Sequence, residues 1–331
     1  MSPRTTQPQQ PTSGLESLAT VADTAYRSGF VCLIGRPNAG KSTLINALVG
    51  AKVAITSSKP QTTRHAVRGI VTRADAQLVI IDTPGLSKPR SLLQERLNDL
   101  VRDTYATVDV VAVCLPADQM VGPGDKYLIA ELATLTERPK LVALATKADK
   151  VSPDRIRRHL LRIAALQDQL GITWEHIVPC SALSGAQVDE VADTLISLLP
   201  AGPKYYPAGE LTDEPEAVLV AELIREAALE LVRDELPHSI TVEIVELGVH
   251  DDTNAKRPIL QVHANLIVER DSQKHIMIGK GGERIKQIGT AARHAIAALL
   301  GTPTRLDLRV KVVKEWQRDP KALRKLGFDT D

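Results

Sequence analysis

Short apolar runs recur through the first two hundred residues. Four of the runs lie at 30–34, 78–81, 141–145 and 177–180. Runs this short and this apolar predict strands buried in a parallel sheet. The stretch 43–49, which follows the first run and the loop after it, favours a helix. The pattern predicts an α/β fold with a mostly parallel, doubly wound sheet.

A change of composition near residue 200 divides the chain. Residues 200–209 contain three prolines and two glycines, which is typical of a semi-rigid linker. Beyond it we expect a helix at 216–235 and strands at 240–245, 259–268 and 306–313, which predict a smaller α+β domain with helices on one face of its sheet. The expected parts are a disordered tail at 1–27, a first domain at 28–199, a linker at 200–215, a second domain at 216–316 and a basic tail at 317–331.

A glycine-rich loop after the first strand matches G-x-x-x-x-G-K-[ST], the phosphate-binding loop. Its glycines let backbone N–H groups surround a phosphate, and the following helix points its positive end at the anion. Lys41 can reach the β- and γ-phosphates, and the Ser42 hydroxyl can ligate Mg²⁺. The residues expected to bind nucleotide here are Gly35, Arg36, Pro37, Asn38, Ala39, Gly40, Lys41, Ser42 and Thr43.

Two further segments predict a metal site and a switch. The DTPG sequence at 82–85 follows a strand, so its carboxylate can hold Mg²⁺ and the Gly85 N–H can meet a γ-phosphate. The polar segment 57–65 predicts a mobile loop. A switch needs a threonine that binds Mg²⁺ only while the γ-phosphate is present. Thr63 is the better candidate and Thr62 the alternative, and either could instead be an ordinary loop hydroxyl. The expected metal ligands are Ser42, Thr63 and Asp82.

The TKAD sequence at 146–149 predicts a guanine site. The Asp149 carboxylate can accept hydrogen bonds from guanine N1–H and the 2-amino group, which are donors that adenine lacks. Lys147 can lay its methylene stem along the base, and a backbone N–H after strand 177–180 can donate to guanine O6. The expected base-binding residues are Thr146, Lys147, Asp149, Ser181, Ala182 and Leu183.

The order of these motifs resembles that of translation-factor-like GTPases, with departures that bear on activity. That family usually carries Asn at the position of Thr146, where the amide contacts the base and ties the loop to the phosphate loop. We expect guanine selectivity to persist through Asp149, with somewhat weaker nucleotide binding. Leu86 stands where many GTPases carry a water-orienting Gln, so intrinsic hydrolysis should be slow.

Asn38 has two interpretations. It either shapes the loop or, as in potassium-activated GTPases, helps hold a monovalent cation that neutralises transition-state charge. The second interpretation predicts faster hydrolysis in K⁺ than in Na⁺. The residues expected to act in hydrolysis are Lys41, Thr63, Gly85 and Asn38.

The net charge of +1 hides an asymmetry in the second domain. Residues 210–252 contain 13 acidic and 2 basic side chains, whereas residues 270–325 contain 5 acidic and 14 basic ones. This distribution predicts either a surface for a polyanion or two solvated faces that compensate each other.

Within the basic block, the GKGG sequence at 279–282 forms a G-x-x-G loop between two helical stretches. Such a loop lets a nucleic-acid backbone approach closely, as in the KH module, which holds about four single-stranded nucleotides. An aromatic content of 3% argues against the stacking platforms of RRM and OB domains. Trp316 is expected to pack the last helix onto the domain. The expected RNA-contacting residues are Arg270, Lys274, Gly279, Lys280, Gly281, Gly282, Arg284 and Lys286.

Composition bounds the remaining classes. At 331 residues and 43% hydrophobic content, the chain can build two cores. No apolar run reaches the length of a bilayer span, and the N-terminal segment lacks the apolar core of a secretory signal. The cysteines lack metal-ligand spacing and are expected to be small buried hydrophobes, which fits a reducing cytosol. They are Cys32, Cys114 and Cys180.

The two motif sets together resemble the bacterial Era family. GRPNAGKS, QTTRH and DTPGL precede SQKHIMIGKGG, with ELPHS and VERDSQK as further matches, and the resemblance covers about residues 28–328. It implies a P-loop GTPase domain and a type 2 KH domain, with GTP, GDP and Mg²⁺ as ligands. It also implies a switch that binds the 3′ end of 16S ribosomal RNA and assists maturation of the small (30S) ribosomal subunit. On the same ground we expect a cytoplasmic monomer that can contact the inner face of the cell membrane peripherally.

Two other functions compete with the switch. An RNA-binding adaptor with a regulatory, weakly hydrolysing nucleotide site would share the RNA features, although Lys41, Ser42, Asp82 and Asp149 argue for activity. A modification enzyme with a GTPase module would need a further catalytic group, such as a reactive cysteine in a basic site, which the strand cysteines do not supply.

Overall fold

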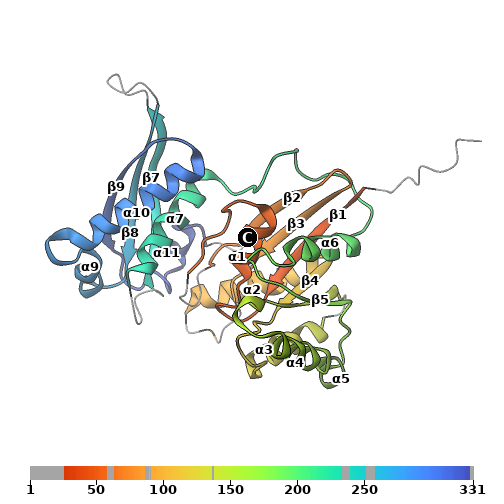
Figure 1. The fold of residues 1–331 in the computed structure, drawn as a ribbon. Coiled ribbons are helices and arrows are strands. Elements are labelled where there is room, and N and C mark those ends of the chain that lie inside the picture. The colour runs from red at the N-terminus through yellow and green to blue at the C-terminus, as the bar shows by residue number, and fades with distance from the viewer. Residues whose placement is uncertain are drawn as a thin grey trace, which may run out of the picture.

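The structure is a computed structural model that describes residues 26–57, 63–85, 89, 91–135, 138–232, 239–250 and 258–328. It contains two domains, drawn from red to green and from green to blue in Figure 1. Most of the expected N-terminal tail, the alternative switch residue Thr62, and Leu86 lie outside the described residues.

A six-stranded sheet forms the centre of the N-terminal domain. Its strands are β1 (Arg27–Ile34), β2 (Val67–Thr72), β3 (Ala76–Asp82), β4 (Val110–Cys114), β5 (Lys140–Ala145) and β6 (His176–Pro179). They lie in the order β2-β3-β1-β4-β5-β6, and only the β2–β3 pair is antiparallel. The prediction of a mostly parallel, doubly wound sheet is therefore confirmed.

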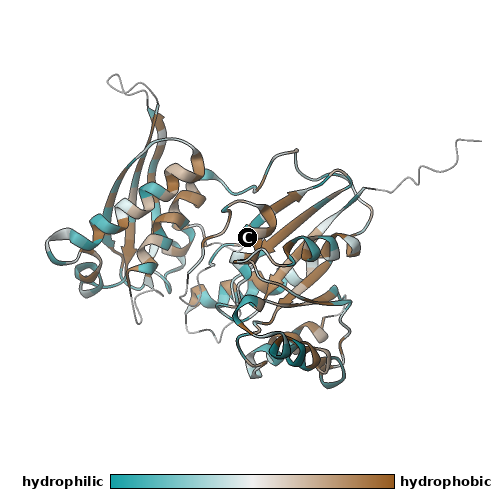
Figure 2. Ribbon diagram, viewed as in Figure 1, coloured by the Kyte–Doolittle hydropathy of each residue, from teal (hydrophilic) through white to brown (hydrophobic). Residues whose placement is uncertain are grey.

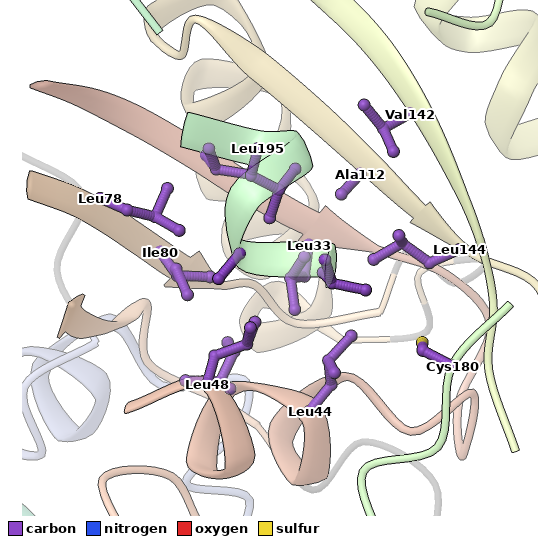
Figure 3. Packing of buried hydrophobic residues seen from close by; sticks show 14 of the residues in the cluster. Leu33, Leu44, Leu48, Leu78, Ile80, Ala112, Val142, Leu144, Cys180 and Leu195 are labelled. Carbon is purple, nitrogen blue, oxygen red and sulfur yellow. The ribbon is translucent and has the colours of Figure 1, made fainter. Parts of the chain in front are cut away.

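Helices cover both faces of this sheet because its buried strands are apolar on both sides. On β1, Val31 and Leu33 pack with the helices of one face, whereas Cys32 and Ile34 pack with those of the other. The first face carries α1 (Lys41–Val49) and α6 (Val188–Leu198), whose Leu44, Leu48 and Leu195 meet the sheet in Figure 3. The second face carries α2 (Leu92–Thr107), α3 (Pro123–Ala133), α4 (Pro153–Ala164) and α5 (Leu166–Leu170). Each fully buried Leu, Ile or Val contributes about 1.5–3 kcal/mol.

The C-terminal domain has a three-stranded sheet covered by helices on one face. In β8 (Ile259–Val268) the residues Leu260, Val262, Ala264 and Leu266 are buried, while Gln261, His263 and Asn265 between them are polar and less buried. In Figure 2 the strands of the N-terminal sheet are mostly brown, whereas those of the C-terminal sheet mix brown and teal. The strand order is β7-β8-β9, antiparallel for the first pair and parallel for the second. The other elements are α7 (Glu216–Glu230), β7 (Thr241–His250), α9 (Asp271–Ile278), α10 (Glu283–Leu300) and β9 (Thr304–Val312).

The segment after β9 folds back between the two domains. It contains α11 (Pro320–Lys325), and its Trp316, Leu323 and Phe328 form an apolar cluster with Leu93 and Leu97 of α2. The Trp316 indole is fully buried and donates to the Ser239 carbonyl oxygen over 3.0 Å. The expectation that this tryptophan packs the chain end onto the domain is confirmed, and residues 317–328, expected as a tail, are ordered by the same cluster.

The connection between the domains runs along the N-terminal domain. The Ile70 N–H of edge strand β2 donates to the Leu211 carbonyl oxygen over 2.9 Å, and Arg68 pairs with Asp213 at 3.0 Å. The Gln77 side chain accepts from the backbone N–H groups of Tyr205 and Tyr206. The segment is thus fixed by hydrogen bonds. Across the described part of the chain, no helix has the length and apolarity that a bilayer crossing requires.

Candidate nucleotide site and RNA-facing loop

The phosphate loop, residues 35–42, connects the end of β1 to the start of α1. Gly35 has a φ of +152°, and a Cβ there would lie 2.7 Å from the Cys114 carbonyl oxygen. This close approach to β4 requires glycine. The Lys41 side chain is buried and its Nζ donates to the Gly35 carbonyl oxygen over 3.1 Å. The ammonium therefore lies over the loop that the motif predicts to hold phosphate.

The three expected metal ligands meet at one carboxylate. Asp82 is fully buried, and its Oδ2 accepts from Ser42 Oγ at 2.6 Å and from Thr63 Oγ1 at 3.0 Å. The two hydroxyl oxygens are 3.3 Å apart. Burial raises the pKa of Asp82, and the Lys41 ammonium opposes that rise.

A buried oxygen at this carboxylate indicates what the site can bind. Asp82 Oδ1 has no hydrogen-bond partner among the residues that the structure describes. A buried polar atom of this kind needs a compensating group. Mg²⁺ prefers oxygen ligands and keeps several waters, so two hydroxyls and a partly unsatisfied carboxylate fit this ion.

A cleft of about 460 Å³ lies beside these residues. Gly85 and Asn38 both line it. A Cβ at Gly85 would lie 3.7 Å from Pro37 of the phosphate loop. Asn38 has a left-handed backbone with φ of 61°, a conformation that Asn adopts more readily than most residues. The Arg36 side chain instead pairs with Asp125 of α3 at 2.6 Å, so at this position only the backbone is left to contact a nucleotide.

A second, smaller pocket of about 80 Å³ gathers the expected base-binding residues. Asp149 Oδ1 accepts from the Ser181 hydroxyl over 2.6 Å, which fixes the carboxylate in the pocket. Lys147 has φ of 57° and begins the turn η1 (Ala148–Lys150). Leu183 is 74% exposed at the edge of the pocket, where it can cover a bound base. The lining residues include Thr146, Lys147, Asp149, Ser181, Ala182 and Leu183.

Thr146 makes the contact with the phosphate loop that an Asn amide was expected to make at this position. Its Oγ1 donates to the Ala39 carbonyl oxygen over 2.6 Å, and the residue is 4% exposed. The hydroxyl therefore joins the base loop to the phosphate loop directly. Because this bond uses the only hydrogen of the hydroxyl, Thr146 has no side-chain donor left for a base.

The cysteine thiols are buried, as predicted. Burial raises the pKa of Cys32 to about 12, and it also raises the pKa of Cys180 to about 12. The pKa of Cys114 is raised for the same reason. Thiols in this state are poor nucleophiles, which removes the cysteine-based modification enzyme from consideration.

The G-x-x-G loop joins α9 to α10 through the turn η2 (Lys280–Gly282), with Lys280 exposed at its tip. Gly279 has φ of +74°, and a Cβ there would lie 2.8 Å from Arg284 Cβ, so the turn requires glycine. The Arg284 guanidinium donates to the Ile276 carbonyl oxygen and so closes the loop. The remaining expected cations, Arg270, Lys274 and Lys286, lie on or beside the two helices that flank the turn.

Sequence reasoning missed the residues that connect the nucleotide site to the C-terminal domain. Arg64 and His65, next to Thr63, contact Ile240, Trp316 and Phe328. Glu226 of α7 accepts from Thr56 on the other side of the same segment. The buried position of Arg64 has no periodic signal in a polar loop, because it results from contact with a distant part of the chain.

Comparison with known proteins places both domains. Residues 30–147 match the family described as 50S ribosome-binding GTPase, and residues 235–317 match the KH domain. GTPase Era of a Nocardioides species is 62% identical over 92% of this chain and 97% of its own length. GTPase Era of Streptomyces coelicolor is 60% identical over 93% of this chain and 96% of its own.

Two solved structures also match nearly the whole chain. A variant of Aquifex aeolicus Era bound to GDP.AlF4- has a TM-score of 0.85 and 35% identity, covering 92% of this chain and 100% of that one. Era in complex with MgGDPNP and nucleotides 1506–1542 of 16S ribosomal RNA has the same TM-score and identity, covering 92% and 99%. With both family models matched and relatives of 60% identity or more over nearly its whole length, the chain belongs to the Era family of GTPases.

Proposed function

We propose that this GTPase is a nucleotide-dependent switch that binds the 3′ end of 16S ribosomal RNA through its KH domain and assists maturation of the small ribosomal subunit. The observation that carries the switch is the meeting of Ser42 and Thr63 at the buried Asp82 carboxylate. The RNA assignment is supported by the exposed Lys280 loop and by the Era structure that contains nucleotides 1506–1542 of that RNA.

In this proposal the nucleotide site works by positioning and by charge. Lys41 neutralises the β- and γ-phosphates, Asp149 selects guanine, and the Gly85 N–H contacts the γ-phosphate. Mg²⁺, held by Ser42, Thr63 and water on Asp82, would supply further neutralisation of phosphate charge. Thr63 ligates Mg²⁺ only while the γ-phosphate is present, so hydrolysis frees its hydroxyl from the metal.

We also propose that K⁺ stimulates hydrolysis. Asn38 lines the cleft beside the phosphate loop, where a monovalent cation could neutralise charge on the leaving group. Turnover should therefore be faster in K⁺ than in Na⁺, and equal rates in both salts would leave Asn38 with a loop-shaping role only. We expect the protein to act as a cytoplasmic monomer, with peripheral contact to the cell membrane on the family resemblance alone.

The test is GTP turnover with and without an oligoribonucleotide that matches the 3′ end of 16S ribosomal RNA. Because coupling between two sites is reciprocal in binding, RNA should tighten the binding of a GTP analogue, and it should also speed turnover. A scrambled oligoribonucleotide is the control. Binding of the matching RNA with no effect on nucleotide affinity or turnover would instead support the adaptor.

A further inference from the structure

One acidic side chain of the KH domain holds the start of the switch segment, residues 56–65. Glu226 lies on α7 and is 6% exposed. Its Oε1 accepts from the Thr56 N–H at 2.8 Å and from Thr56 Oγ1 at 3.2 Å. Its Oε2 pairs with Lys52. Both carboxylate oxygens are therefore used to bind the N-terminal domain.

The end of the switch segment is held by a second set of contacts with the same domain. Arg64 is 3% exposed, donates to the Ile240 carbonyl oxygen over 2.6 Å and lies 5.6 Å from the centre of the Trp316 ring. The His65 and Phe328 rings stack with centroids 4.7 Å apart.

These two attachments lie on either side of Thr63. The hydroxyl of Thr63 contacts Asp82 in the nucleotide site, and the next residue, Arg64, is buried against the other domain. A single peptide unit cannot change length, so the docking of the KH domain constrains where Thr63 can lie. Residues 58–62 lie outside the described part of the segment.

We propose that Glu226 is a positioning residue for the GTPase site: by holding Thr56 it helps the KH domain, which also binds Arg64, keep Thr63 in the arrangement that binds GTP. Fixing the segment in advance lowers the ordering cost that would otherwise oppose GTP binding. GDP lacks the γ-phosphate and does not need Thr63, so its binding should not depend on Glu226. The proposal rests on the proposed role of Thr63 as the ligand that responds to the γ-phosphate.

The experiment measures the affinities of the full-length protein for a non-hydrolysable GTP analogue and for GDP, both with Mg²⁺, together with kcat and KM for GTP. Glu226→Ala should lower the affinity for the analogue about tenfold, which equals about 1.4 kcal/mol, while the affinity for GDP changes less than about twofold. Glu226→Gln keeps an acceptor for Thr56 and should stay within about threefold of the natural protein. Glu230→Ala removes an exposed carboxylate one turn further along α7 and serves as the matched control.

Three results would overturn the proposal. The first is an unchanged affinity of Glu226→Ala for the analogue. The second is an equal loss of affinity for the analogue and for GDP, which would indicate a merely structural role. The third is the same loss of analogue affinity in Glu230→Ala. A measurement on the natural protein distinguishes failure of this proposal from failure of the proposed function. If it bound the analogue and GDP without any Mg²⁺-dependent difference, the switch itself would be refuted, and this proposal with it.

Discussion

Replacing Thr146 with valine tests how the base loop and the phosphate loop are joined. Valine has nearly the same shape but lacks the hydroxyl that donates to the Ala39 carbonyl oxygen at 2.6 Å. A net hydrogen bond contributes about 0.5–1.5 kcal/mol, and a buried acceptor left without its partner costs about 1–3 kcal/mol. Since Thr146 is 4% exposed, water cannot easily replace the lost donor. We expect nucleotide affinity to fall roughly tenfold, which corresponds to about 1.4 kcal/mol.

The expected loss has a signature that a general loss of folding would not show. Ala39 belongs to the loop that holds phosphates common to both nucleotides, so GTP-analogue and GDP affinities should fall by the same factor. Guanine selectivity over adenine should persist, because Asp149 carries it. Titration of fluorescent nucleotides, with thermal unfolding as a control for folding, measures both quantities.

The converse change, Thr146→Asn, should bind both nucleotides more tightly, because an amide can keep the tie to Ala39 and also contact the base. An affinity unchanged in Thr146→Val, or unchanged or lower in Thr146→Asn, would refute this account of the site.

Three further predictions concern other parts of the molecule. Asp149→Asn should lower guanine nucleotide affinity roughly 100-fold, because two hydrogen bonds to a charged acceptor are weakened. The same change should improve the binding of xanthosine diphosphate, and titration of both nucleotides measures the two effects. Lys280→Asp combined with Gly281→Asp should weaken the matching oligoribonucleotide by roughly tenfold or more in filter binding, with RNA-free GTP turnover unchanged. Because burial raises the thiol pKa values, iodoacetamide should leave the three cysteines of the native protein unlabelled at pH 8, where the thiolate is absent. It should label all three after unfolding, and rapid labelling of the native protein would contradict their burial. These residues are Cys32, Cys114 and Cys180.

Much of the fold and of the nucleotide site could be predicted because their signals are local. The apolar runs of the sheet are short and continuous, and each motif residue sits at the end of one of them. That topology brings Ser42 and Asp82 together although 40 positions separate them. The G-x-x-G loop is similarly local, because the positive φ of Gly279 results from its own turn.

What could not be predicted depends on contacts between distant segments. Arg64 is polar and lies in a loop without periodicity, yet Ile240 and Trp316 enclose it. The residues after 316 have a basic, tail-like composition, but Leu323 and Phe328 join Trp316 and the α2 residues Leu93 and Leu97 in one apolar cluster. The direction of Arg36 likewise depends on Asp125 of α3, almost ninety positions away.

The connection that runs beside β2 also covers part of an exposed sheet edge. An edge strand presents unpaired backbone groups that can recruit a strand of another chain. Here the Leu211 carbonyl oxygen accepts a hydrogen bond from the Ile70 N–H, and the Arg68–Asp213 ion pair holds the connection against the strand. A GTPase fragment truncated at Leu199 would bare this edge and should aggregate on storage, whereas one extended through Glu214 should stay dispersed. We therefore expect the connection between the domains to hinder edge-to-edge association of this sheet with other chains.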